Sequence, residues 1–438
     1  MMSPAWLTRL ARKERYNEYD DLSEEEADRR LQWLADTVDE LEANFSYDAL
    51  DLETRTSWDL WIYQFERARE AAAFRRGNYI FTQMLGPQAS VPQFLIRFHR
   101  VDDVADMAAY IERIGGISRA IRQLLVQAQV RAQQGVRPPR FGHEGAISEA
   151  QKLIRGVPFD RIGPDSPLWA DAMKKIASLE DEGKVDAETA ERLRAETRAA
   201  LLEEFEPSYT DLIDWLNADI DFVSAVPQGV GSLPNGPEYY QYRLNISTTT
   251  DLTAEEIHQI GLDEVARIQS EMNVIKDQVG FAGDLQAFFN FTREDQRFQY
   301  PNTDEGRQGY IDDSVAYLDF INEKLLDYFG ILPKADLIVR RVEPFREQDG
   351  APQHYSLGAP DGSRPGVYYA HLSDMSAMPK HLMEAIAYHE GNPGHHMQIS
   401  IAQESESVPK FRTQLGFTAY SEGWGLYAEL LAKEMGAY

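Results

Sequence analysis

Apolar residues recur at helical spacing through most of the chain, and this pattern predicts a mainly α-helical protein. After Ser23, apolar residues return every third or fourth position from Leu31 to Leu41, as they do on one face of an amphipathic helix. The same spacing is found over 58–65 and 104–134. Ser23 has a glutamate three residues later, which is typical of a helix N-cap. We therefore expect a helix to begin there and two more to follow.

Two further stretches organise the first half of the chain. Residues 165–222 keep helical spacing but are densely charged, which predicts a solvated helical hairpin. Residues 226–237 are rich in glycine and proline, as expected of a boundary between two parts. This places an N-terminal helical half at 1–225 and a second half at 226–438. In the second half, Thr253 and Glu256 have the spacing of a capping box.

Short β-branched and aromatic runs interrupt the helical pattern between residues 335 and 372. The runs are LIVRRVEPF, HYSLGAP and GVYYAHL, with Asp361-Gly362 as a turn signal between the last two. Runs of this length and composition are typical of strands. They predict a small antiparallel sheet, after which a helix resumes at Pro379, a favoured first-turn residue.

The net charge and the absence of cysteine exclude several classes of function for this protein. The chain has 44 Lys and Arg residues against 72 Asp and Glu residues, for a formal net charge of −28. Such a charge repels nucleic acid and anionic membranes. Cysteine is absent, which excludes disulfides and thiolate chemistry. No run approaches the ~18 apolar residues of a membrane helix, and no signal peptide is visible at the start, so the compartment stays open.

The residues best suited to bind a metal or to catalyse a reaction are concentrated between residues 378 and 427. His389-Glu390 is followed by Gly-Asn-Pro-Gly and then by His395-His396, and Glu422 stands on the next segment of helical pattern. Two imidazoles and a carboxylate are the protein ligands of an open zinc site, and a further glutamate can carry protons beside them. His143-Glu144 has no second histidine at ligand spacing, so we give it little weight.

The spacing of the histidines requires a distorted helix. His395 and His396 follow His389 by six and seven residues, and neither position returns beside His389 in a straight helix. Pro393 breaks the helical hydrogen bonding, and Gly391 and Gly394 allow backbone conformations that other residues avoid. We predict a bulge that brings His395 back beside His389, with His396 kept as an alternative ligand or substrate-binding residue. Glu429 shares a helix face with Glu422 and could support the site.

These motifs resemble a bacterial family known as domain of unknown function eight-eight-five, whose signature is similar to HEGxPGHHxQ followed by an EGW helix. The resemblance extends over GVGSLPNGPEYYQY, TTTDLTAEEIHQIGLDEV and DGSRPGVYY. The family is similar to gluzincin peptidases, including the thermostable carboxypeptidase and angiotensin-converting-enzyme groups. It implies a largely helical molecule with a deep channel, one Zn²⁺ held by His389, His395 and Glu422, and Glu390 as general base.

The resemblance also implies a substrate site. It places the strand 366–370 antiparallel to a peptide substrate above the metal. Gly366, Tyr368, Tyr369 and His371 become candidates to bind substrate. His396 and Tyr420 become candidates for catalysis. Tyrosines on a strand are more often packing residues, and that reading stays open for each of them.

We therefore expect zinc-dependent hydrolysis of peptide bonds, with carboxypeptidase-like action on short peptides. Two alternatives remain: a non-catalytic binding or scaffold protein of the same fold, and a hydrolase of a non-peptide amide. Members of the resembled family usually continue beyond the EGW helix. The resemblance thus implies that this chain is a fragment, or that a companion chain supplies the remainder.

Overall fold

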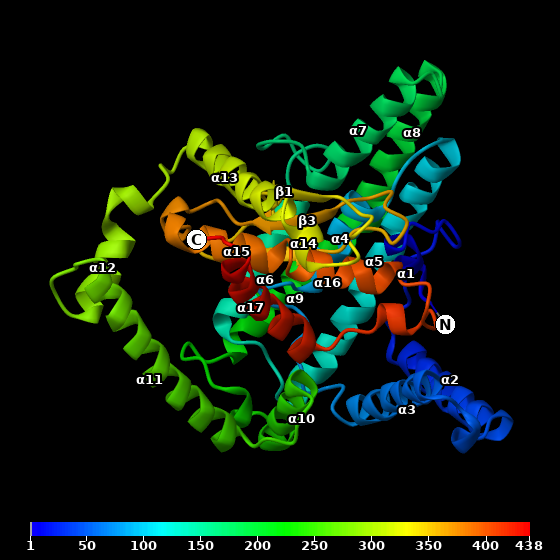
Figure 1. Ribbon diagram of the computed structural model, residues 1–438. Coiled ribbons are helices and arrows are strands. Elements are labelled where there is room, and N and C mark those ends of the chain that lie inside the picture. Colours follow the sequence, from blue (N-terminus) through cyan, green and yellow to red (C-terminus); the bar gives the residue numbers. More distant parts are fainter. Residues whose placement is uncertain (1) are drawn as a thin grey trace. The chain divides into compact units, whose positions relative to one another are not determined.

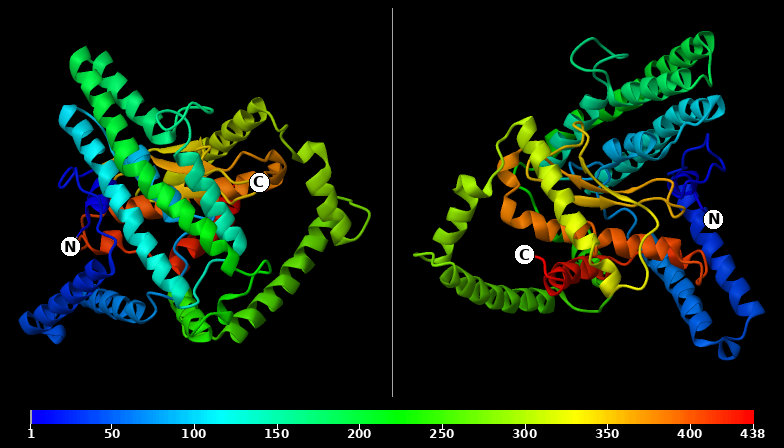
Figure 2. Two further views of the ribbon diagram at one scale, coloured as in Figure 1. Left: turned by 180° about the vertical axis from the view of Figure 1, so that it is seen from behind. Right: turned by 45° about the horizontal axis from the view of Figure 1, so that its top comes forward.

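The computed structural model describes residues 2–438 and is mainly helical, with one small sheet (Figures 1 and 2). It divides into two compact units, Met1–Tyr239 and Tyr240–Tyr438, referred to below as the N-terminal and C-terminal units. The division lies within helix α10 (Gly236–Thr248), just beyond the glycine- and proline-rich boundary expected at residues 225 and 226. No helix within residues 2–438 combines the length and the apolar character needed to span a membrane.

The N-terminal unit consists of helices and short helical turns. Helix α5 (Val104–Gln133) has apolar residues at the expected helical spacing, and Met107, Ile114 and Ile121 on it are fully buried. As expected, Ser23 caps a helix by accepting a hydrogen bond from the backbone N–H of Glu26. The remaining elements are α1 (Pro4–Arg9), α2 (Glu24–Asn44), η1 (Tyr47–Ala49), α3 (Leu52–Ala73), α4 (Pro87–Phe98), α6 (Arg140–Leu153), α7 (Pro167–Asp181), α8 (Ala187–Ala200), η2 (Leu201–Phe205), α9 (Glu206–Asp219), η3 (Ile220–Phe222) and η4 (Val230–Ser232).

The charged stretch 165–222 is helical, but the prediction that it is merely solvated was wrong. Helices α7 and α8 lie side by side (Figure 1), and the chain continues through η2 into α9. Ile176, Leu193, Phe205 and Leu212 are fully buried. Most of the charges occupy outward positions, with Asp219 a buried exception. The apolar residues at every third or fourth place form part of the core.

The C-terminal unit contains the rest of the helices and the sheet. Thr253 and Glu256 form the expected capping box at the start of α11 (Ala254–Gln278), a helix with no buried residue. The other helical elements are α12 (Leu285–Glu294), η5 (Gln296–Phe298), α13 (Asp304–Asn322), α14 (Leu325–Tyr328), η6 (Met375–Ala377), α15 (Lys380–Glu390), α16 (His395–Glu404), η7 (Arg412–Gln414) and α17 (Thr418–Glu434).

The sheet is mixed, so the prediction of an antiparallel sheet was wrong for one of its strands. It consists of β1 (Leu337–Arg341), β2 (His354–Ser356) and β3 (Gly366–Ala370), in the order β1-β3-β2. β3 pairs antiparallel with β2 and parallel with β1. The sequence runs show where strands form, but not that the last strand inserts between the first two.

One apolar core joins the helices that follow the sheet. Tyr388 of α15, Met397 of α16 and Leu431 of α17 pack together with Ile321 of α13, and all four are buried. On the sheet side, Tyr368 of β3 packs against Ala387 of α15. This core fixes α15, α16 and α17 to one another, and these are the helices that carry the candidate ligands.

Candidate metal centre

The helix that carries His389 breaks rather than bulges. α15 ends at Glu390, four residues of connection follow, and α16 begins at His395. The connecting glycines do not adopt left-handed conformations, since φ is −98° at Gly391 and −79° at Gly394. They permit close approach instead: a Cβ on Gly394 would lie 2.0 Å from the carbonyl oxygen of His389. The predicted bulge was therefore wrong in form, although the turn does return His395 to His389.

Three of the expected ligands converge from three helices. The rings of His389 and His395 lie 4.7 Å apart between centroids and are nearly perpendicular. Oε2 of Glu422 lies 3.6 Å from Nε2 of His389 and 3.7 Å from Nε2 of His395. Ligands about 2.1 Å from a tetrahedral zinc ion lie about 3.4 Å from one another. The two distances from Glu422 are close to this value, and the three ligand atoms all lie within 4.8 Å of one another.

α17 reaches this position because it has a glycine where it passes the first histidine. A Cβ on Gly425 would lie only 2.6 Å from Nε2 of His389. By contrast, Gly423 on the same helix has no atom within 4 Å of the place a Cβ would take. Only one of the two neighbouring glycines is thus required by the packing of the site.

A second carboxylate of α17 orients the first histidine. Oε1 of Glu429 lies 2.8 Å from Nδ1 of His389, and this hydrogen bond is the main reason that the pKa of His389 is raised. His395 differs, because burial lowers its pKa. Nδ1 of His395 is buried without a hydrogen-bond partner among the described residues.

Glu390 lies beside the three ligands in a poorly solvated position. It is 7% exposed, and its Oε2 atom is buried without a hydrogen-bond partner within residues 2–438. Burial, aided by the negative charges of Glu422 and Glu429, raises the pKa of Glu390 to about 7, although His389 and the backbone N–H of Tyr355 act in the opposite direction. A carboxyl group with such a pKa can accept and release a proton near neutral pH.

His396 lies away from this cluster. Its Nδ1 atom is 3.1 Å from the hydroxyl of Tyr355, and burial lowers the pKa of His396 to about 4. A Cβ on Gly366 would lie 2.6 Å from that same Nδ1 atom. Gly366 therefore makes room for the His396–Tyr355 pair, and the structure does not bring His396 to the ligands.

Three residues expected to bind substrate, two on β3 and one just after it, have hydrogen-bond partners within the protein. Tyr368 is fully buried, with its hydroxyl 3.0 Å from that of Tyr310. Tyr369 is 1% exposed and donates a hydrogen bond to Glu343. Nδ1 of His371 accepts a hydrogen bond from the backbone N–H of Gln348. The two buried tyrosines thus fit the packing role that the sequence left open, and substrate binding by the three residues stays a prediction.

The strand placed above the metal by resemblance was also the wrong one. β3 is the central strand, with β1 and β2 on its two sides, so a peptide could not pair with its backbone. The edge strand beside Glu390 is β2, because the backbone N–H of its middle residue Tyr355 acts on the Glu390 carboxylate. Tyr420 is 59% exposed near the start of α17.

A comparison with protein families decides the affiliation. The family described as "Bacterial protein of unknown function (DUF885)" matches residues 4–438. The chain belongs to this family. No curated protein matches it.

Solved structures resemble this DUF885 protein over nearly its whole length. The crystal structure of a "putative lipoprotein" from Colwellia psychrerythraea has a TM-score of 0.87 and 25% sequence identity, covering 99% of this chain and 75% of that one. A "putative lipoprotein of unknown function" from Shewanella oneidensis has a TM-score of 0.61 and 16% identity, with the same coverage. These likenesses support the helical fold.

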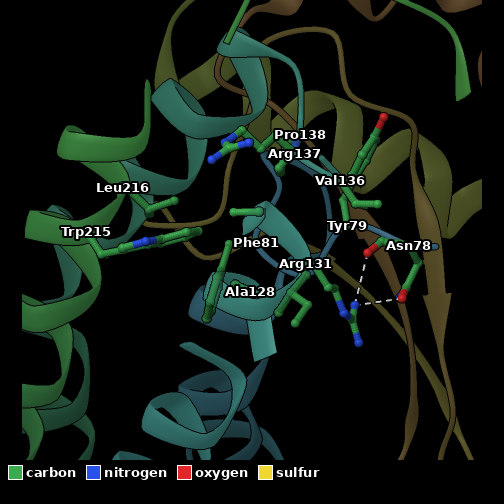
Figure 3. A pocket seen from close by; sticks show the side chains of 12 residues that line it. Asn78, Tyr79, Phe81, Ala128, Arg131, Val136, Arg137, Pro138, Trp215 and Leu216 are labelled. Carbon is green, nitrogen blue, oxygen red and sulfur yellow. Dashed lines mark hydrogen bonds between the residues drawn. The ribbon is translucent and has the colours of Figure 1, made fainter. Parts of the chain in front are cut away.

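Among the described residues 2–438, the other polar groups of this DUF885 protein do not form a comparable site. His143 is fully buried, with Nε2 3.2 Å from Oδ2 of Asp219, as befits a packing histidine. A small pocket in the N-terminal unit is lined by Phe81 and Trp215 among others, and by Arg131, which donates to Asn78 (Figure 3). No histidine or carboxylate lines it. Within residues 2–438, His389, His395 and Glu422 form the one group able to hold a metal ion.

Two residues at the site were not singled out from the sequence. Tyr355 contributes its hydroxyl to His396 and its backbone N–H to Glu390. Trp424 donates a hydrogen bond from its indole to the carbonyl of Pro393. A signal existed for Trp424, which lies in the EGW motif. For Tyr355, in a three-residue strand, there was none.

Proposed function

We propose that this protein is a zinc-dependent peptidase of gluzincin type, with carboxypeptidase-like action on short peptides. The observation that carries the proposal is the convergence of His389, His395 and Glu422 beside the buried Glu390. The proposal includes a substrate channel, as the resemblance to gluzincins implies.

The types of donor group at the site also support the proposal of zinc. Two imidazoles and one carboxylate leave a fourth coordination position open, as in catalytic zinc sites. Zinc held there would act as a Lewis acid that polarises a carbonyl group and lowers the pKa of water. Burial lowers the pKa of His395, which favours the neutral imidazole that binds a metal. Glu429 holds Nδ1 of His389, so that Nε2 is left free for coordination.

Glu390 is the proposed proton carrier. Its Oε2 atom has no competing hydrogen bond among the described residues, and burial brings its pKa to about 7. The carboxylate would take a proton from attacking water at Oε2. It would then deliver that proton to the amine that leaves when the peptide bond breaks.

The edge strand β2 gives a peptide a place to lie. The middle strand β3 is paired on both sides, whereas β2 has one free edge. An extended peptide can add to such an edge through main-chain hydrogen bonds. Because the backbone N–H of Tyr355 acts on Glu390, a peptide on this edge would have its scissile bond near the proton carrier.

Replacing Glu390 by Gln tests the proposal. The wild-type protein should bind one zinc ion and cleave members of a peptide library, as read by mass spectrometry. Glu390→Gln should keep the zinc and lose about 10²–10⁴-fold in kcat. Glu384→Gln is the matched control, because Glu384 lies on the same helix and binds the hydroxyl of Tyr388.

Two results would overturn the proposal. Unchanged turnover in Glu390→Gln would remove the proton carrier. Zinc-loaded wild-type protein that cleaves nothing in the library would favour a non-catalytic binding protein or an enzyme acting on a different amide.

A further inference from the structure

The connection Gly391–Gly394 leads directly into His395 and is not helical. Backbone hydrogen bonds tie it to the helices at its two ends, since the N–H of Gly391 donates to Ala387 and the N–H of His396 donates to the carbonyl of Gly391. Side chains from two neighbouring helices add further hydrogen bonds. Nδ2 of Asn392 lies 2.8 Å from Oδ1 of Asn322 on α13. On the other side, Nε1 of Trp424 donates to the carbonyl oxygen of Pro393 at 2.8 Å.

The hydrogen bond from Trp424 to the Pro393 carbonyl lies next to two of the candidate metal ligands. The Pro393 carbonyl belongs to the peptide that enters Gly394, the N-cap of α16, and His395 is the next residue. Trp424 stands two residues after Glu422 on one turn of α17. The hydrogen bond therefore joins the backbone next to one ligand to the helix turn that carries another.

We infer that Trp424 is a positioning residue, whose indole N–H sets the separation of His395 and Glu422 and thereby the affinity of the site for zinc. The inference rests on the proposed function, since it takes these side chains as metal ligands. Trp424 acts through the backbone, and none of its atoms is assigned to the metal or to a substrate.

Helix geometry explains why one hydrogen bond can have this effect. Gly425 brings α17 within 2.6 Å, measured from its virtual Cβ, of Nε2 of His389, so α17 is fixed close to the first ligand. The apolar core fixes the later turns of α16 and α17 to α15. In the connection between α15 and α16, the Pro393 carbonyl has a partner on α17, the indole N–H of Trp424, and substitution can remove it.

Trp424→Phe removes the donor and keeps an aromatic ring. Trp61→Phe is the control, because Nε1 of Trp61 donates a comparable bond to Thr37 Oγ1 in the N-terminal unit. The zinc dissociation constant would be measured by competition with a chelator, and the visible spectrum of the Co²⁺-loaded protein would report ligand geometry. We expect zinc binding about 10–100-fold weaker and a changed cobalt spectrum in Trp424→Phe. Trp61→Phe should match the wild type in both.

Replacing Trp424 alone by β-(3-benzothienyl)alanine, in which sulfur takes the place of the N–H, repeats the test without changing the shape of the ring. The same loss of zinc affinity in this variant supports the inference. Unchanged zinc affinity and an unchanged cobalt spectrum in the analogue overturn it. A wild-type protein that binds no stoichiometric zinc would overturn the proposed function itself, and the two failures are thus distinguishable.

Discussion

Nδ1 of His389 lies 2.8 Å from Oε1 of Glu429, while Nε2 of the same ring faces Glu422 at 3.6 Å. Glu422 and Glu429 are seven residues apart on α17, so one imidazole lies near two carboxylates that stand two turns apart on one face of the helix. The Nδ1 contact is the shorter and has hydrogen-bond length. It places a proton on Nδ1 and leaves the lone pair of Nε2 pointing at the proposed metal position.

Removing the Glu429 carboxylate should weaken metal binding without removing a ligand. In Glu429→Gln, the His389 ring loses the charge that fixes its tautomer, and we expect zinc to bind about 10–100-fold more weakly. Zinc competition with a chelator measures the change. Glu434→Gln is the control, since Glu434 lies at the exposed end of the same helix. Equal zinc affinity in the two variants would contradict the role of Glu429.

The two glycines of the EGWG sequence should respond differently to a methyl group. A Cβ on Gly425 would lie 2.6 Å from Nε2 of His389, whereas Gly423 has open space. Gly425→Ala must therefore displace α17 or the His389 ring, and stoichiometric zinc binding should be lost. Gly423→Ala should keep zinc and gain up to about 1 kcal/mol in the free energy of unfolding, because alanine stabilises a helix interior.

Zinc titration and thermal unfolding of the two alanine variants would check this prediction. Zinc binding by Gly425→Ala that equals that of Gly423→Ala would show that the close approach of α17 has no part in the site.

Much of the fold follows from local pattern. The helix over 104–134 was predicted within one residue of its observed end, and the capping box of Thr253 and Glu256 is present. These features depend on residues close in sequence, where spacing carries the information. The convergence of His389, His395 and Glu422 could also be anticipated, because Pro393 and its flanking glycines exclude a straight helix.

Features that depend on long-range pairing were not predictable in the same way. Nothing in the composition of β3 shows that it inserts between β1 and β2, and this order decides which strand has a free edge. The close contacts at the glycines of the connection were not predictable either. Gly391 and Gly394 have negative φ, and what requires them is the nearness of side chains and carbonyl groups from other turns.

Acid should destabilise the N-terminal unit through His99, one of its buried histidines. His99 is 1% exposed, its Nε2 atom lies 2.9 Å from the carbonyl oxygen of Asp106, and Arg113 contacts Nδ1. Burial, with the charge of Arg113, lowers the pKa of His99 to about 3. A histidine with a depressed folded-state pKa contributes stability above pH ~6.5, its unfolded value. This contribution is lost as the pH falls through 6.5 toward 3.

Between pH 7.5 and pH 5 the loss for this one group should be about 2 kcal/mol. Urea unfolding followed by tryptophan fluorescence measures it, because every tryptophan except Trp424 lies in the N-terminal unit. The pH dependence should shrink by that amount in His99→Gln but not in His258→Gln, which alters an exposed residue of α11. The same pH dependence in wild type and His99→Gln would contradict the assignment.

The adjacent histidines 395 and 396 should separate metal binding from stability. His395 faces His389 and Glu422, so His395→Ala removes a ligand and should abolish stoichiometric zinc binding. His396 is 2% exposed and contacts the hydroxyl of Tyr355. His396→Ala should therefore lower the free energy of unfolding by about 1–3 kcal/mol, because a buried side chain and its hydrogen bond to Tyr355 are lost, while one zinc ion per chain remains bound.

Thermal unfolding with and without zinc distinguishes the two histidines. A ligand at 100 times its Kd stabilises the folded state by about 2.7 kcal/mol. This gain should appear in wild type and in His396→Ala, and it should be absent in His395→Ala and after chelation. If His396→Ala loses the zinc-dependent gain and His395→Ala keeps it, the ligand set is His389, His396 and Glu422. The arrangement of α16 described above would then have to differ when metal is bound.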